Sequence, residues 1–150
     1  FDIADASSPK ETAKALKSLY ESLKRKKPPE RATQVLRMLC RIGEASHADR
    51  YELASRLLQT SHKDTSSSAR RGDDALHELD RLLREGFDVV SALRRDRSVG
   101  LEEMYYIGFH FIEADHPAGE ELLLQVADKG GRKKIGKMAK NKLALAGNAA

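Results

Sequence analysis

The stretch DHPAGEELLLQVADKGGRKKIGKMAKNKLALAG, from Asp115 to Gly147, contains two helical segments in succession. A proline stands at the start of the first segment, where its missing amide costs nothing, and apolar residues recur three and four positions apart. Gly130 and Gly131 interrupt the pattern, and a second, strongly basic segment follows them. We therefore predict two short helices that fold back on each other as a hairpin.

The rest of the chain repeats this order of a cap, a short amphipathic segment and a glycine or proline. Ser8 and Glu11 form a capping box for the first segment, with Pro9 in the first helical position. The predicted helices begin near Pro9, Pro29, Ser46, Asp73, Asp88, Leu101, Pro117 and Arg132. The sequence thus predicts an all-α fold of about eight helices in antiparallel hairpins, stacked as a short right-handed α-α superhelix.

From Pro117 to Gly147 a capped helix, a glycine break and a basic helix with small residues follow one another. Through this stretch the chain resembles the HEAT and armadillo family of α-α superhelices. Its hairpins are spaced by roughly 30 to 40 residues, as in helical repeats, and the first ones are also similar to a tetratricopeptide-type array. The resemblance implies a curved stack that binds protein, peptide or nucleic acid, and it implies no catalytic residue.

The length and composition of the chain are typical of one domain. A chain of 150 residues, of which 40% are hydrophobic and 33% charged, can form one hydrophobic core with a charged, solvent-exposed surface. We therefore expect a single domain over residues 1–150. Residues 60–72 contain almost nothing to bury, and we expect a mobile loop there.

The composition also indicates the cellular compartment in which the protein is expected. The single cysteine, Cys40, excludes an intrachain disulfide and a multi-cysteine metal site, and it suits a reducing compartment. No apolar run approaches the roughly 20 residues of a membrane span. We therefore expect a cytoplasmic location and no membrane partner.

The last predicted helix is strongly basic, and no acid follows Asp128. Its cations and those just before it are Lys129, Arg132, Lys133, Lys134, Lys137, Lys140 and Lys142. Lys133, Lys137 and Lys140 share one helix face, and the turn at Gly131 is expected to add amides that bind anions. Two interpretations stay open: a site for a nucleic-acid phosphate backbone over residues 129–142, and a solvated outer face of a terminal helix.

An aromatic cluster in the sixth predicted helix contains Tyr105, Tyr106, Phe109 and Phe111. Among the aromatics of the sixth helix, Tyr106 is expected to face outward and, with His110, to offer a weak partner-binding site. His110 and Glu113 share a face but lack the H-E-x-x-H pattern, so we expect no metal site. The acidic pairs stand at helix starts, where they complement the dipole. We expect no catalytic residue and no cofactor.

These observations predict a non-catalytic macromolecular interaction module, and not an enzyme. A protein-binding scaffold is the first interpretation. Nucleic-acid binding through the basic helix 129–142 is the alternative. The oligomeric state stays open.

Overall fold

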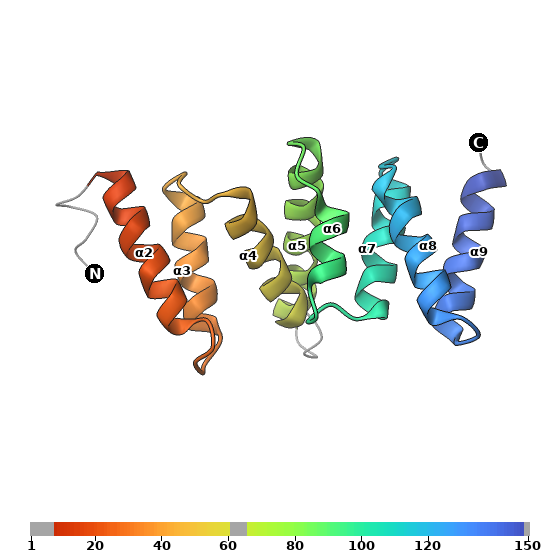
Figure 1. Cartoon of the computed structure of the whole chain (residues 1–150), viewed down its shortest axis with the longest axis horizontal. Coiled ribbons are helices and arrows are strands. Elements are labelled where there is room, and N and C mark those ends of the chain that lie inside the picture. Colours follow the sequence, from red (N-terminus) through yellow and green to blue (C-terminus); the bar gives the residue numbers. More distant parts are fainter. Residues whose placement is uncertain (1–7, 61–65, 149–150) are drawn as a thin grey trace. The chain divides into compact units, whose positions relative to one another are not determined.

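The structure is a computed structural model that describes residues 8–60 and 66–148 (Figure 1). Within these ranges the chain forms eight helices and no strand, so the all-α prediction is confirmed. The helices are α2 (Pro9–Leu23), α3 (Glu30–Arg41), α4 (His47–Thr60), α5 (Ser66–Arg84), α6 (Val89–Arg95), α7 (Leu101–Glu113), α8 (Ala118–Gly130) and α9 (Lys134–Asn148). The right-handed superhelical stacking stays a prediction.

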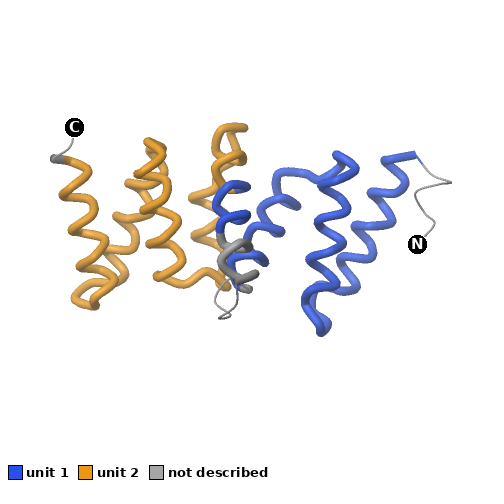
Figure 2. The backbone as a smooth tube through the Cα atoms, turned by 180° about the vertical axis from the view of Figure 1, so that it is seen from behind, with its two compact units in different colours: residues 1–78 blue, residues 79–150 orange. Residues whose placement is uncertain are grey.

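The chain divides into two compact units, residues 1–78 and 79–150 (Figure 2). The single domain expected over residues 1–150 stays a prediction. None of the helices in the described ranges combines the length and the hydropathy that crossing a membrane requires.

The caps read from the sequence stand at the expected helix starts. Ser8 Oγ accepts a hydrogen bond from the Glu11 amide at 3.3 Å. At α4 the capping box is reciprocal: the Asp49 amide donates to Ser46 Oγ at 3.1 Å, and the Ser46 amide donates to Asp49 Oδ2 at 3.0 Å. Each bond satisfies an amide that the first helical turn leaves unpaired.

The start of α5 corrects the expected loop over residues 60–72. The helix begins at Ser66, whereas we predicted a start near Asp73, and α4 includes Thr60. Residues 61–65 lie outside the described residues. Alanine and arginine are good helix formers, so a polar segment can extend a helix whose later turns are anchored by buried Leu79 and Leu82.

The first unit packs α2 against α3 and α3 against α4. Its fully covered side chains are leucines and alanines, among them Leu16, Leu36, Leu39 and Ala54. Burial of each such leucine contributes about 1.5–3 kcal/mol to folding. The apolar stripes of the sequence therefore mark the core correctly in this unit.

Tyr20 joins α2 to α4 through a polar network at the edge of that core. Its hydroxyl donates to Glu52 Oε2 at 2.8 Å and accepts from Arg56 Nε at 3.1 Å. Arg56 also donates to the carbonyl of Lys24 at 2.9 Å, which satisfies a carbonyl just beyond α2. Burial raises the pKa of the Tyr20 phenol to about 12.

In the second unit, α7 packs on α8 and α8 on α9, at distances that only glycine allows. A Cβ on Gly119 would lie 2.6 Å from the backbone nitrogen of Ile112. A Cβ on Gly130 would lie 2.7 Å from Cα of Gly136. The paired glycines Gly130 and Gly131 thus allow the end of α8 to pack directly against the start of α9.

Candidate interaction surface

Two aromatic side chains of α7 are exposed on one side of the helix. Tyr106 is 62% exposed and Phe109, one turn later, is 36% exposed, whereas Met104, Ile107 and Phe111 are buried. The outward position expected for Tyr106 is therefore confirmed. Buried Tyr105 contacts both rings, with centroid distances of 5.6 Å to Tyr106 and 5.9 Å to Phe109.

Lys142 connects these aromatics to α9. Its Nζ lies 4.0 Å from the centroid of the Phe109 ring and forms an ion pair with Glu113. A cation over an aromatic face is attracted by the quadrupole of the ring. One amine thus holds α9 against the aromatic side of α7.

Leu145 is an exposed apolar residue of α9, about one turn after Lys142. It follows Lys142 by three residues, so the two side chains lie on neighbouring positions of the helix, and it is 66% exposed. We call the surface made by Tyr106, Phe109, Lys142 and Leu145 the α7–α9 face. It combines exposed apolar side chains with a charged pair that fixes one helix to the other.

The predicted cations lie on the outside of the turn and of α9. Lys129 lies in the last turn of α8, Arg132 and Lys133 lie in the turn, and Lys134 starts α9. All of these side chains, and those of Lys137 and Lys140, are exposed. Positions four and seven residues after Lys133 share its face of the helix, so the structure brings Lys133, Lys137 and Lys140 into one row.

Lys142 does not belong to that row, because its amine is occupied by Glu113 and Phe109. Two amides of the turn are also occupied: Gly131 donates to the carbonyl of Ala127 at 3.1 Å, and Lys133 donates to that of Gly130 at 2.9 Å. The anion-binding contribution expected from the amides of the helix start near Gly131 otherwise stays a prediction. The side-chain cations form the basic surface.

His110 lies beside Tyr106 and Phe109 in the sequence, and its ring pairs with a carboxylate of α5. Its Nε2 donates to Asp80 Oδ2 at 2.7 Å, and its side chain is 31% exposed. The imidazole therefore joins α7 to α5, and the partner-binding role expected for His110 stays a prediction.

Asp80 was not among the predicted site residues, and it is a buried carboxylate that is only 6% exposed. His110 binds one of its oxygens, and Nε2 of His116 lies 3.6 Å from the other, Oδ1. Among the residues that the structure describes, Oδ1 has no hydrogen-bond partner. A signal was present: Asp80 follows Leu76 by four residues and precedes Leu83 by three, which puts it on the apolar side of α5.

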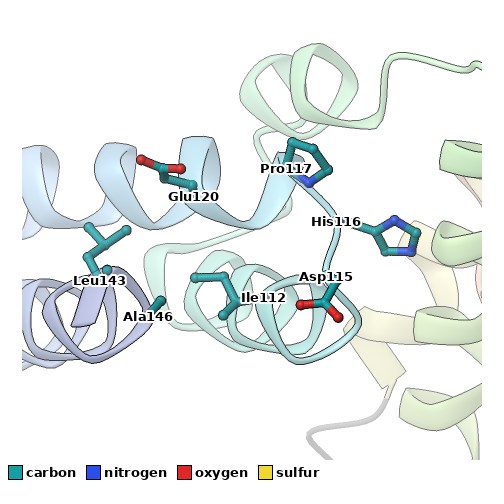
Figure 3. Close-up of a pocket in the computed structure, with 8 residues that line it drawn as sticks. Ile112, Asp115, His116, Pro117, Glu120, Leu143 and Ala146 are labelled. Atoms are coloured by element: carbon teal, nitrogen blue, oxygen red, sulfur yellow. The ribbon is translucent and has the colours of Figure 1, made fainter. Parts of the chain in front are cut away.

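A recess of about 390 Å³ lies where α7 ends, α8 begins and α9 ends (Figure 3). Its apolar wall consists of Ile112, Leu143 and Ala146, and two exposed carboxylates, Asp115 and Glu120, stand beside it. Figure 3 shows the His116 ring directed away from Leu143. His116 also lines the recess, and its Nε2 lies 3.6 Å from Asp80 Oδ1.

No group of three histidine, cysteine, aspartate or glutamate side chains in residues 8–60 and 66–148 is arranged to hold a metal ion. Comparisons with protein-family models, with curated proteins and with solved structures find no match. The resemblance to HEAT and armadillo superhelices accordingly stays a prediction.

Proposed function

We propose that this chain is a non-catalytic interaction module that binds a protein partner through the α7–α9 face. The exposed ring of Tyr106 is the observation that carries the proposal. Tyrosine is among the residues that contribute most to protein–protein binding, because it offers a large rigid surface with one polar atom. Phe109 and Leu145 are the other exposed apolar side chains of the α7–α9 face.

The way this surface is built supports the same function. Phe109 is held between Tyr105 and the amine of Lys142, which is itself paired with Glu113. Side chains fixed before binding lose less conformational entropy when a partner arrives. The α7–α9 face is therefore suited to binding with little rearrangement.

The direct test is selection of binders from a displayed library of random peptides against the full chain. Peptides enriched on the unmodified chain are then measured against the Tyr106→Ser variant by fluorescence anisotropy. Loss of an aromatic anchor costs about 2 kcal/mol or more of binding free energy, so affinity falls by roughly thirtyfold. Leu124→Ser is the matched control, since Leu124 is another exposed side chain, 53% accessible, on α8.

Retention of the enriched peptides by the Tyr106→Ser variant would exclude this face as the binding site. Failure to enrich any peptide would count against the protein-binding function itself. Thermal unfolding of each variant establishes that a lost affinity reflects the surface and not the fold.

Nucleic-acid binding is a second candidate, and the row of Lys133, Lys137 and Lys140 favours it. These cations are exposed, and no acid occurs in the sequence between Lys129 and Asn148. Lysines that contact phosphates release counterions, so this function requires an affinity that falls steeply with salt.

Its test is titration of duplex DNA and single-stranded RNA with the triple variant in which Lys133, Lys137 and Lys140 are replaced by glutamate. Removing three phosphate contacts lowers the slope of log affinity against log salt by about two to three. The same replacements at Lys10, Lys14 and Lys17 are the control, because these exposed lysines of α2 have identical spacing. Absence of binding at low salt would exclude this candidate.

A further inference from the structure

We infer that the partner of the α7–α9 face is an acidic peptide segment that places apolar side chains on Leu145 and carboxylates on Lys134 and Lys137. This inference rests on the proposed function, because it names the chemistry of the partner for the same face.

Leu145 belongs to a row that also carries cations. Lys134, Lys137, Asn141 and Leu145 follow one another at steps of three, four and four residues, so they lie on one side of α9. All four side chains are exposed. The row therefore begins with two ammonium groups and ends, about two turns later, with an isobutyl group.

The charge of this row is not balanced within its own helix. Lys133 and Lys140 lie beside it, and the sequence has no acid from Lys129 to Asn148. The nearest acid that the contacts identify, Glu113 on α7, is already paired with Lys142. A partner that approaches α9 along this side meets a positive potential, which favours carboxylates and disfavours lysine or arginine.

Charge alone would fit a phosphate backbone equally well, and Leu145 distinguishes the two partners. Phosphates and sugars gain little from an exposed leucine, whereas an apolar peptide side chain removes its surface from water. Because Leu145 stands in the same row as Lys134 and Lys137, a ligand that uses the whole row carries both carboxylates and apolar groups.

An amphipathic acidic helix meets these requirements through its own periodicity. Carboxylates three and four residues apart lie on one side of such a helix, which matches the step from Lys134 to Lys137 on α9. Apolar residues at the same spacing on the peptide reach Leu145.

The experiment measures three synthetic helical peptides against the full chain by fluorescence anisotropy. They share one stripe of leucines and differ only at the flanking positions, which are all glutamate, all glutamine or all lysine. A duplex DNA is the fourth probe. The inference predicts that the glutamate peptide binds about tenfold more tightly than the glutamine peptide, that this difference shrinks with added salt, and that the lysine peptide binds least.

Two variants locate the site. Replacing Lys134 and Lys137 by glutamine should abolish the preference for glutamate, and Leu145→Ser should weaken both the glutamate and the glutamine peptides. Replacing Lys14 and Lys17 by glutamine removes the same charge at the same spacing from α2, and Leu124→Ser removes an exposed leucine from α8. Both controls should leave the affinities unchanged.

Equal affinity for glutamate and glutamine peptides overturns the inference and leaves the proposed function standing, provided that Tyr106→Ser weakens both. If the α2 control loses the preference for the glutamate peptide to the same extent, the attraction is a nonspecific effect of a basic protein. That result also overturns the inference. If the chain binds the duplex DNA but none of the three peptides, the result supports the nucleic-acid candidate and overturns both the inference and the proposed function.

Discussion

The Asp80 carboxylate and the His110 imidazole meet inside the second unit, with 2.7 Å between Oδ2 and Nε2. This bond satisfies one oxygen of a carboxylate that is almost fully buried, and it joins α5 to α7. A polar group in such a place stabilises the fold only as long as its partner remains.

His110→Ala is therefore expected to lower the free energy of unfolding by about 1–3 kcal/mol, since it leaves both oxygens of Asp80 without a hydrogen bond. His116→Ala should cost less, because its Nε2 lies 3.6 Å from Oδ1. Urea unfolding measures both. The double variant Asp80→Ala/His110→Ala should lose less free energy of unfolding than the two single variants lose together. A loss equal to the sum of the two single-variant losses would contradict the pairing.

Gly130→Ala is expected to destabilise the second unit by about 1–3 kcal/mol, because the added Cβ would meet the backbone of α9 and neither helix can move freely. Gly147→Ala is the matched control in α9. It has no atom within 4 Å of its added Cβ, so the better helix propensity of alanine should stabilise the chain by about 0.5–1 kcal/mol. Thermal unfolding distinguishes the two, and a stabilising Gly130→Ala would show that the helices do not approach so closely.

Tyr20 predicts a loss of stability in alkali. Its pKa is raised from 10.0 to about 12 in the folded chain, chiefly by burial. Between these two values the unfolded chain has released the phenolic proton while the folded chain retains it, so stability falls as the pH rises. Unfolding measured across this window should show a shallower pH dependence in Tyr20→Phe. An identical slope in both proteins would mean that the Tyr20 phenol ionises equally well in the folded state.

Leu122 and Leu124 lie two positions apart on α8, and their exposed fractions are 0% and 53%. Leu122 is fully buried, so Leu122→Ala should cost about 2–5 kcal/mol through lost contacts and the cavity that remains. Leu124 is 53% exposed, and Leu124→Ala should change stability by no more than about 0.5 kcal/mol. Urea unfolding compares them. Equal costs would contradict the orientation of α8.

Much of the fold could be predicted because caps and apolar spacing are local. Ser46 and Asp49 lie three residues apart in the chain, and this spacing alone predicts their reciprocal hydrogen bonds. The predicted start of α5, near Asp73, was wrong because the residues that stabilise its first turns lie far along the helix. A polar segment gives no apolar stripe, and its helix continues from turns anchored much later, at Leu79 and Leu82.

The site could be predicted only in part. An outward Tyr106 and a row of exposed lysines follow from helical periodicity alone. The contact of Lys142 with Phe109 and Glu113 depends on how α9 packs beside α7, and the pairing of His110 with Asp80 joins residues thirty positions apart. Neither contact has a signature within a single helix.

The two contacts of Lys142 also affect its chemical reactivity. Its side chain is 15% accessible and its nitrogen is engaged by a carboxylate and a ring, whereas Lys137 and Lys140 extend into water. Acylating reagents would consequently modify the lysines of α9 in two kinetic classes. The slow class would report, by mass spectrometry, whether α7 and α9 remain attached.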